Sequence, residues 1–473
     1  MTTPPSGAAT TPGRVLVTGV TGYIGGLLVP ALLEAGRTVR VLGRSEAKLR
    51  REPWFGQVEA TIGSATEREV LDRALDGVEV AYYLLHSMDG KGDFVERDRR
   101  MAEGFAAAAR AAGVGRIVYL SGLHPSGELS PHLASRVEVG EIFLASGVPT
   151  AVLQAGVVLG NGSASFDMLR HLTERLPVMV APKWLHNRIQ PIAIDDVLHY
   201  LVAAADLPPE VNRTYDVGGP EVLTYADMMR RYAEVTGLGG RFIRTVPVLT
   251  PELASHWVGL VTPVLSGVAR PLVGSLIHDA VCHEDDAHRD LGLPPGGLTG
   301  YDNAIRAAVA EIDPQLWRRT LRRVGAVVGA AALAGSLLTD PDSRWYRELA
   351  KPPWQPPAAA FPVVWTTLYG IITLASTTTI AELTEKGEAG EAEEYWAALA
   401  ANLALNAGWS GVFFRAQNLP AATAVAGALT VSGVDLARRG AAAGPGKAIG
   451  LGLYAAWCGF ATALSASVAR RNP

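Results

Sequence analysis

"RVLVTGVTGYIGG", residues 14–26, decides the fold of the first half of the chain. RVLVT is a β-branched run typical of a buried parallel strand, and the amphipathic stretch LLVPALLEAG follows the glycines. The glycines allow a tight turn, close approach of the backbone to a pyrophosphate, and close packing of helix on strand. The start of a helix also favours an anion. This order predicts a doubly wound α/β domain that binds a nucleotide through Gly19, Thr21, Gly22, Tyr23, Ile24 and Gly25.

A second strand, TVRVLGR at residues 38–44, follows about twenty residues later, where such domains contact the ribose. It ends in Arg44 instead of the Asp or Glu that grips the ribose hydroxyls of NAD. Arg44 and Ser45 could hold the 2′-phosphate of NADP by charge-assisted hydrogen bonds. NADP(H) is therefore the expected cofactor, and NAD is less favoured. The alternative is that Arg44 is simply a solvated arginine after a strand.

Length, charge and cysteine content set limits on the remaining interpretation. At 473 residues the chain exceeds what one hydrophobic core usually organises, so at least two domains are expected. The net charge of -4 gives no basic field, and nucleic-acid binding is not expected. Only Cys282 and Cys458 occur, too far apart for a disulfide framework, and no metal site is predicted. Residues 1–13 are polar and proline-rich, which predicts a disordered tail and no signal peptide.

The distribution of charged and apolar residues changes near residue 324. Charged residues are interspersed before this point, and several apolar stretches follow it closely. Several of them approach the roughly 20 residues needed to cross a hydrocarbon core of about 30 Å. The alternative, a soluble bundle of buried helices, would show polar faces that these stretches lack. We therefore predict an integral membrane domain, an all-α bundle of five transmembrane helices. The stretches are residues 324–338, 361–381, 396–414, 421–437 and 448–468.

Arginines indicate how this domain is oriented. Four of them, within residues 318–323, stand directly before the first stretch, and such residues tend to stay in the cytoplasm. The N-terminal domain is therefore expected in the cytoplasm, and five spans place the C-terminus on the opposite side. The sequences ELTEKGEAGEAEEY (382–395) and ARRGAAAGPGK (437–447) are then expected to be cytoplasmic loops.

Four further segments of the first half carry a recognisable pattern. They are VEVAYYLLHSM (78–88), GRIVYLSGL (115–123), QPIAIDDVLHYL (190–201) and YDVGGPEVLTYADMM (215–229). With the glycine turn, they resemble the atypical and extended short-chain dehydrogenase/reductase superfamily in its NmrA-like, NAD(P)-binding branch, over residues 14 to about 312. The resemblance implies a Rossmann sheet with a substrate lobe from about residue 155. It also implies that Leu84, His86 and Ser121 line the nicotinamide crevice.

One departure from this superfamily concerns its YxxxK pair, in which the tyrosine is the acid and the lysine lowers its pKa. The corresponding stretch here, SPHLASRVEVGE (130–141), places His132 at the tyrosine and Arg136 at the lysine. Two interpretations stay open. In the first, His132 is the general acid, Arg136 favours its neutral form and Ser121 polarises a carbonyl. In the second, His132 and Arg136 are solvated surface residues of a domain that binds the cofactor without turnover.

A second resemblance covers the membrane portion, about residues 324–471. WYRELAKPPWQPPAAAFPVVWTTLYG (345–370), NLALNAGWSGVFF (402–414) and LYAAWCGFATAL (453–464) resemble the TspO/MBR family of tryptophan-rich sensory proteins. The resemblance implies a five-helix bundle whose pocket binds a flat apolar ligand, such as a porphyrin or a sterol, beneath the loop after the first span. The candidate ligand-binding residues are Trp345, Trp354, Trp365, Tyr369, Asn402, Asn406, Trp409 and Trp457.

These side chains also have a plainer interpretation. The asparagines could hold helices together, and the tryptophans could form an interfacial belt. The fifth span departs from the family pattern, because Leu453 stands where a proline is usual and Ser465 where an asparagine is usual. Ligand preference is therefore expected to differ. Small residues at 424–433 leave homodimerisation through the bundle open.

The apolar segment LASHWVGLVTPVLSGVARPLVGSLI, residues 253–277, contains Pro263, Arg270 and Pro271, which argue against a regular span. Two interpretations of this segment stay open. It forms an apolar wall of the substrate lobe, or it presents a face that lies on the bilayer.

The sequence as a whole predicts a fusion of two domains. A tail (1–13) precedes an NAD(P)-binding domain (14–312), a basic linker (313–323) and a TspO/MBR-like membrane domain (324–473). The favoured function is sensing or handling of a hydrophobic ligand (porphyrin, sterol or isoprenoid-like), coupled to the nicotinamide redox state. The alternatives are a membrane-tethered NADPH-dependent reductase of a lipophilic carbonyl compound and a non-catalytic scaffold that binds the cofactor.

Overall fold

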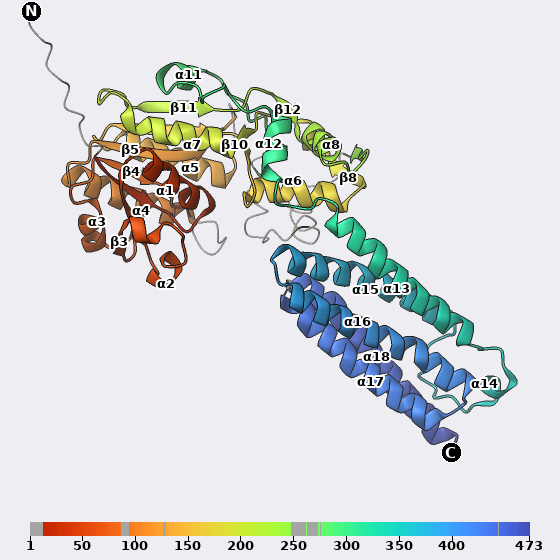
Figure 1. Ribbon diagram of the computed structural model, residues 1–473. Coiled ribbons are helices and arrows are strands. Elements are labelled where there is room, and N and C mark those ends of the chain that lie inside the picture. The colour runs from red at the N-terminus through yellow and green to blue at the C-terminus, as the bar shows by residue number, and fades with distance from the viewer. Residues whose placement is uncertain are drawn as a thin grey trace, which may run out of the picture. The chain divides into compact units, whose positions relative to one another are not determined.

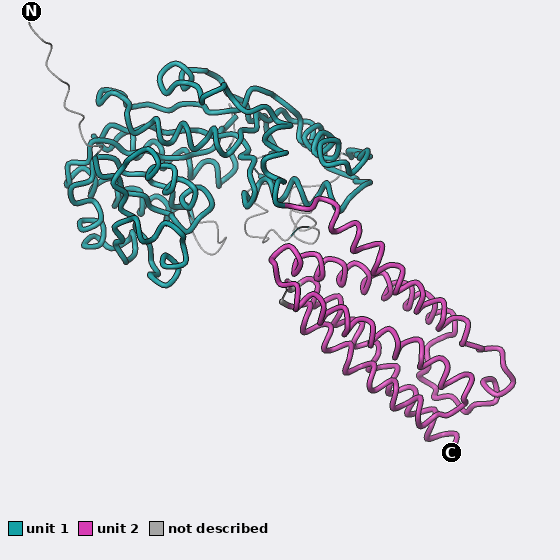
Figure 2. Tube along the Cα trace, viewed as in Figure 1, with its two compact units in different colours: residues 1–311 teal, residues 312–473 magenta. Residues whose placement is uncertain are grey.

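The computed structural model describes residues 13–86, 94–125, 129–246, 262, 273–274, 276–442 and 444–473. The chain forms two compact units, residues 1–311 and residues 312–473 (Figure 2). Apart from Gly13, the expected tail lies outside the described residues, and so does most of the apolar segment 253–277.

A seven-stranded parallel sheet forms the centre of the first unit (Figure 1). Its strand order is β11-β6-β5-β4-β1-β2-β3, so β1 lies between β4 and β2. The chain order reverses at this point, and the carboxyl ends of β1 and β4 therefore form a topological switch point. The predicted doubly wound sheet is confirmed. The strands are β1 (Arg14–Thr18), β2 (Thr38–Gly43), β3 (Glu59–Ile62), β4 (Val80–Tyr83), β5 (Arg116–Gly122), β6 (Thr150–Ala155) and β11 (Arg213–Val217).

Helices cover both faces of this sheet. Val15 and Val17 of β1 belong to a core with helices α1 and α7, whereas Leu16 belongs to a core with α3, α4 and α5. All three side chains are fully buried, which is why this strand is apolar throughout and does not alternate. The helices are α1 (Tyr23–Glu34), α2 (Glu46–Leu49), α3 (Arg68–Leu75), α4 (Phe94–Ala111), α5 (Pro131–Leu144) and α7 (Ile194–Ala203).

A smaller lobe is formed by the segments that follow β6. Three two-stranded sheets, β10 with β7, β12 with β9 and β13 with β8, lie beside helices α6, α8 and α12. The resemblance implied a lobe of this kind from about residue 155. Its elements are β7 (Val158–Leu159), α6 (Ala164–Arg175), β8 (Val178–Pro182), β9 (Arg188–Ile189), β10 (Ile192–Ala193), β12 (Leu223–Thr224), α8 (Tyr225–Val235), β13 (Phe242–Val246) and α12 (Tyr301–Ala308). Helix α11 (Asp286–Asp290) lies against β11 instead, and its Ala287 belongs to the core of the large sheet.

The second unit is a bundle in which five described helices are long and apolar enough to cross a membrane. This confirms the predicted five-helix membrane domain. A short helix, α14, lies in the connection between the first two long helices. The helices are α13 (Leu316–Leu338), α14 (Arg344–Glu348), α15 (Ala360–Glu385), α16 (Ala389–Ser410), which continues as a π-helical turn (Gly411–Arg415), α17 (Leu419–Ala442) and α18 (Pro445–Arg471).

The helix ends differ from those expected. The arginines of the expected linker lie inside α13, which begins at Leu316. The prediction of a loop over residues 382–395 is wrong for most of that range, because α15 runs to Glu385 and α16 begins at Ala389. The loop predicted over 437–447 is likewise wrong up to Ala442. Alanine, glutamate and arginine are good helix formers, so charged residues continue these helices beyond the apolar stretches.

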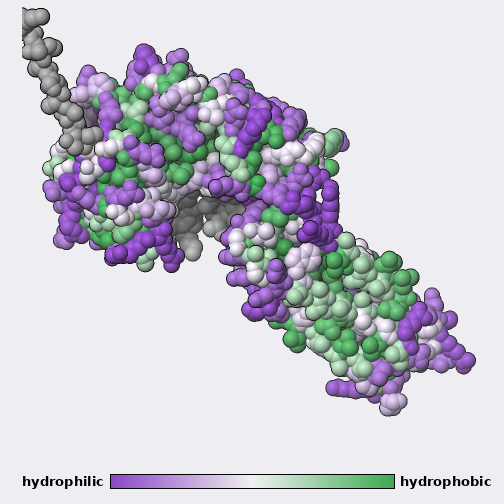
Figure 3. Space-filling model, viewed as in Figure 1, coloured by the Kyte–Doolittle hydropathy of each residue, from purple (hydrophilic) through white to green (hydrophobic). Residues whose placement is uncertain are grey.

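The surface of the bundle is apolar in its middle. On the face in view, apolar residues cover the central part and hydrophilic residues gather at the two ends (Figure 3). Large apolar side chains point outward from several helices, as for Leu337 (68% exposed), Val363 (68%) and Val431 (71%). Such a surface matches a hydrocarbon environment, because water would penalise this much exposed apolar area.

Candidate functional site

The glycine turn lies between β1 and α1, at the switch point. Gly19 has φ +69°, and a Cβ there would lie 2.5 Å from the Leu84 carbonyl oxygen. A Cβ on Gly25 would lie 2.4 Å from the Gly19 carbonyl oxygen, so both positions require glycine. Gly22 caps α1 without a side-chain hydrogen bond. The first amides of the helix are therefore left for an anion, as a bound pyrophosphate requires.

Thr18 fixes the geometry of this turn, and sequence reasoning missed it. Its hydroxyl donates to the Tyr82 carbonyl oxygen at 3.0 Å and accepts from the Leu84 amide at 3.1 Å. One buried side chain thus joins the ends of β1 and β4 and holds Leu84 against Gly19. The only signal in the sequence is a threonine directly before the first glycine.

A cleft of about 400 Å³ connects the glycine turn with the carboxyl ends of β4, β5 and β6. Residues from the smaller lobe, including Met168, Tyr225 and Leu276, complete its walls. The predicted site residues that line it are Gly19, Gly22, Tyr23, Ile24, Gly25, Leu84, His86, Ser121, His132 and Arg136. The structure therefore brings the expected cofactor loop and the expected catalytic residues to one cleft.

Helix α5 presents His132 and Arg136 one turn apart. The helix is fixed at its start by Ser130, whose Oγ accepts from the Leu133 amide at 3.3 Å. The Arg136 Nη2 donates to the Leu120 carbonyl oxygen at 2.7 Å. Both side chains are half-buried at the wall of the cleft. Burial, aided by the charge of Arg136, lowers the pKa of His132 to about 4, so its imidazole is neutral at pH 7.

Ser121 ends β5 next to this pair. The residue is 3% exposed, and its hydroxyl has no well-formed hydrogen bond in the part of the chain that the structure describes. A buried hydroxyl that lacks a well-formed hydrogen bond is costly, by up to about 1–3 kcal/mol. A ligand oxygen in the cleft would offset this cost.

Three of the predicted cofactor residues do not line the cleft. Thr21 is exposed beside the glycine turn. Arg44 is exposed just after β2, the strand adjacent to β1, and Ser45 is the N-cap residue directly before α2. Within the described ranges, the Arg44 side chain has no hydrogen bond or ion pair. It is thus available to a phosphate at the edge of the sheet.

In the second unit, Asn402 and Asn406 of α16 join helices to one another. Asn402 Oδ1 accepts from the Tyr454 hydroxyl at 2.7 Å, and its Nδ2 donates to the Ser432 Oγ at 3.2 Å. Asn406 Oδ1 accepts from the Tyr369 hydroxyl at 2.7 Å. These bonds are those expected of asparagines that hold helices together.

The candidate tryptophans fall into two aromatic groups. Trp345 and Trp409 contact Phe413 of the π-helical turn, at ring-centroid distances of 5.6 and 5.0 Å. In the other group Trp354 and Trp457 contact Phe460, at 5.8 and 5.1 Å, and Trp365 contacts Tyr369 at 5.6 Å. The indole nitrogens of Trp409 and Trp457 are buried and have no hydrogen-bond partner among the described residues.

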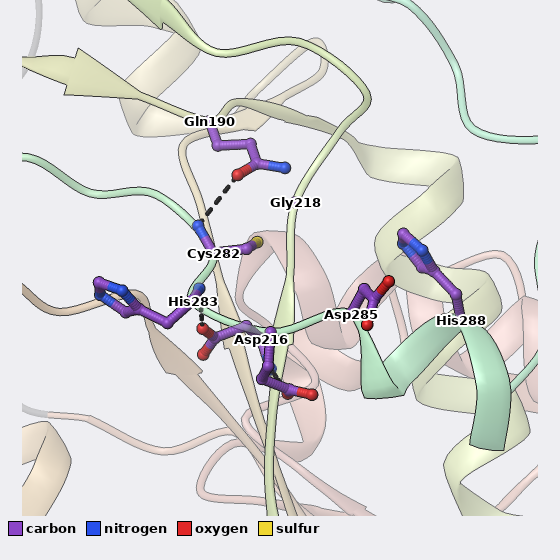
Figure 4. A pocket seen from close by; sticks show the side chains of 8 residues that line it. Gln190, Asp216, Gly218, Cys282, His283, Asp285 and His288 are labelled. Carbon is purple, nitrogen blue, oxygen red and sulfur yellow. Dashed lines mark hydrogen bonds between the residues drawn. The ribbon is translucent and has the colours of Figure 1, made fainter.

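A second pocket, of about 380 Å³, lies in the first unit beside β11 (Figure 4). Gln190 accepts from the Cys282 amide at 2.9 Å, and Asp216 accepts from the His283 amide at 2.7 Å. Asp285 and His288 lie on one side of the pocket, and His283 points away on the other. No cluster of three ligating side chains suited to a metal ion occurs among the residues that the structure describes. The polar groups of this pocket instead join the segment before α11 to the edge of the sheet by hydrogen bonds.

Two family models match the chain. The NmrA-like family matches residues 11–248, and the TspO/MBR family matches residues 324–471. The two resemblances found in the sequence are confirmed.

Three relatives show what the two parts are similar to. A ceramide reductase from Caulobacter vibrioides is 30% identical over 280 residues, 54% of this chain and 83% of that protein. A 3β-hydroxysteroid dehydrogenase/Δ5→4-isomerase from Mycobacterium tuberculosis is 26% identical over 330 residues, 60% of this chain and 86% of that protein. A tryptophan-rich sensory protein from Cereibacter sphaeroides is 42% identical over 100 residues, 21% of this chain and 58% of that protein.

Proposed function

The chain belongs to the NmrA-like family and carries a TspO/MBR domain, and from this premise we propose that it is a membrane-anchored NADP(H)-dependent reductase of a lipophilic carbonyl compound. The observation that carries the proposal is the single cleft that joins the glycine turn to Ser121, His132 and Arg136. The sequence alone favoured ligand sensing as the function and gave the reductase as an alternative. Here the reductase comes first.

The residues of the cleft fit a nicotinamide cofactor. The uncapped start of α1 supplies amides for the pyrophosphate, and Gly19 and Gly25 keep the backbone close to the strand. Leu84, His86 and Ser121, at the ends of β4 and β5, would flank the nicotinamide. Arg44 and Ser45 would hold the 2′-phosphate of NADP, a choice supported by the absence of any partner for Arg44 in the described ranges.

When bound, NADPH would supply a hydride to the carbonyl carbon of the substrate. The Ser121 hydroxyl would donate a hydrogen bond to the carbonyl oxygen, and the neutral His132 would donate its N–H to the same oxygen. Burial lowers the pKa of His132, and the charge of Arg136 lowers it further, so the imidazole is neutral near pH 7. A neutral imidazole does not give up its N–H proton near pH 7, so the proton that completes the alcohol would come from solvent. In this proposal His132 is an oxyanion donor, and neither the general acid nor the solvated surface residue that the sequence left open.

The lipophilic nature of the substrate is supported from two directions. The walls of the cleft include Leu123, Leu133, Val157, Val158 and Met168. Two relatives of the first unit are named for ceramide and for a hydroxysteroid, both of which are lipids.

The test is NADPH oxidation by the full-length protein in detergent, with lipophilic ketones and with detection of the alcohol. We expect Ser121→Ala and His132→Phe to lower kcat about 100-fold, the cost of one lost oxyanion donor, with little change in NADPH affinity. His186→Phe is the matched control, because that ring lies exposed at the surface. Cofactor binding without turnover of any ketone would instead support the non-catalytic scaffold.

A second candidate function is the sensing of a hydrophobic ligand in the bundle. It is favoured by the buried indole nitrogens of Trp409 and Trp457, which have no partner in the described part of the bundle. Polar groups of a porphyrin-like, sterol-like or isoprenoid-like ligand could accept from them. Trp345, Trp354, Trp365 and Tyr369 would provide further aromatic contacts. Titration of protoporphyrin IX with NADP⁺ and with NADPH bound tests coupling to the redox state, and identical affinities would reject it.

Sidedness and assembly belong to the same proposal. The arginines at 318–323 support a cytoplasmic first unit, joined through residues 313–323, with the C-terminus on the opposite side. Small residues at 424–433 of α17 are compatible with a homodimer through the bundle.

A further inference from the structure

Tyr225 lines the same cleft from the smaller lobe, and the mechanism above does not use it. It is the first residue of α8 and is 2% exposed. Thr224 caps this helix by accepting from the Asp227 amide at 3.1 Å, and the strand before the helix pairs with β9. The position of Tyr225 is therefore fixed by the helix start and by the small sheet.

The hydroxyl of Tyr225 is buried and has no hydrogen-bond partner within the described residues. Neighbouring buried tyrosines differ from it. The Tyr301 hydroxyl donates to the Met228 carbonyl oxygen at 2.6 Å, and the Tyr232 hydroxyl donates to Glu174 Oε1 at 2.6 Å. Tyr200 also lacks a partner, but it belongs to the core between sheet and helix and does not line the cleft.

An unpaired phenol inside a protein lowers stability, so folding alone gives no reason for it. Burial raises the pKa of Tyr225, and the group therefore remains a neutral hydrogen-bond donor across the physiological range. From the same lobe, the cleft is lined by the apolar side chains of Val158, Met168 and Leu276 and by the polar side chains of Ser163 and Ser165. A few polar groups in a mainly apolar wall orient an otherwise apolar ligand.

We propose that the Tyr225 hydroxyl binds an oxygen atom of the substrate, and that it selects apolar molecules that carry an oxo or hydroxyl group over pure hydrocarbons. This inference rests on the proposed function and deepens it. Ser121 would contact the substrate from the large sheet and Tyr225 from the smaller lobe. The sheet and the lobe would then each bind one side of the substrate. Among the described residues that line the cleft, Arg136 is the one cationic side chain, which disfavours substrates that carry several phosphates.

The experiment compares Tyr225→Phe with Tyr301→Phe in the full-length protein. Tyr301 is the matched control, because it is equally buried and close in the fold but already has a partner. The probes are progesterone and 2-tridecanone, with affinities measured by equilibrium dialysis in the presence of NADP⁺. The melting temperature and the NADPH affinity of each variant are measured in parallel.

We expect Tyr225→Phe to weaken probe binding about tenfold, the typical effect of one hydrogen bond, while the melting temperature stays equal or rises. Tyr301→Phe should lower the melting temperature and leave probe affinity unchanged. If Tyr225→Phe binds both probes as the wild type does, the role of Tyr225 is refuted and the reductase proposal stands. If the wild type binds NADPH but neither probe, the proposed substrate class is itself refuted.

Discussion

At the scale of single residues, the hydrogen bond from Arg136 to the Leu120 carbonyl oxygen, 2.7 Å long, fixes the guanidinium at the wall of the cleft. It holds a positive charge one helical turn from His132, and that charge adds to the effect of burial on the imidazole. The imidazole is therefore neutral at pH 7, as the proposed hydrogen-bond donor requires. The replacement of the tyrosine and lysine of the superfamily was visible in the sequence, but its consequence depends on burial, which only the fold supplies.

The lowered pKa of His132 predicts a pH effect on stability. Its folded pKa, about 4, lies below the ordinary value of 6.5, so between these values the unfolded chain binds more protons than the folded one. The stabilisation is complete above pH 6.5 and is lost as the pH falls towards 4. We expect His132→Phe to lose less stability than the wild type between pH 7 and pH 5, as measured by thermal unfolding at each pH. Parallel pH profiles for the two proteins would show that His132 titrates normally.

At the scale of elements, the junction of β1 with β4 shows what the sequence could and could not predict. The apolar run of β1 and the three glycines predicted a strand, a turn and a helix, and all three are present. The register of β1 against β4, which brings Thr18 between Tyr82 and Leu84, is a tertiary property. Tyr225 escaped prediction for the same reason, since nothing local marks a tyrosine as lining a cleft.

Removal of the Thr18 hydroxyl tests this junction. We expect Thr18→Val to destabilise the first unit by about 1–3 kcal/mol, because the Leu84 amide loses its acceptor in a buried site. Cofactor affinity should fall as well, since Leu84 borders Gly19. Denaturant unfolding and NADPH titration of the full-length protein are the measurements. Thr61→Val in β3 is the control, and an equal loss in both variants would contradict the account.

In the bundle, the apolar stretches predicted five helices, but not the points at which they end. Composition alone did not show that α16 begins within the acidic stretch, at Ala389. Alanine and glutamate support a helix in water as well as in lipid, so the helix extends beyond its apolar part. The sequence left open whether the asparagines bind a ligand or hold helices together, and the structure shows their hydrogen-bond partners on α15, α17 and α18.

Asn402→Leu should therefore weaken the bundle. Two hydroxyls, those of Tyr454 and Ser432, would lose their partner, at a cost of about 1–2 kcal/mol in an apolar surrounding. Unfolding in increasing dodecyl sulfate, followed by circular dichroism, measures this loss. Ala404→Leu, an exposed position on the same helix, should be close to neutral. If the two variants unfold alike, the hydrogen bonds of Asn402 do not hold the helices together.

At the scale of the whole molecule, the chain joins a unit with a nicotinamide-type cleft to a unit built for lipid. A membrane anchor raises the local concentration of a substrate that dissolves in the bilayer, so a reductase of lipophilic carbonyl compounds gains from the fusion. In the alternative function, ligand sensing, the affinity of the bundle for its ligand would differ between the NADP⁺-bound and NADPH-bound states.

The most direct test of the central claim is ketone-dependent NADPH oxidation in sealed membrane vesicles that contain the full-length protein. We expect activity that stays with the membranes after a carbonate wash and that responds to added NADPH only in vesicles with the cytoplasmic face outward. Activity in the soluble fraction, or equal activity in vesicles of both orientations, would contradict it.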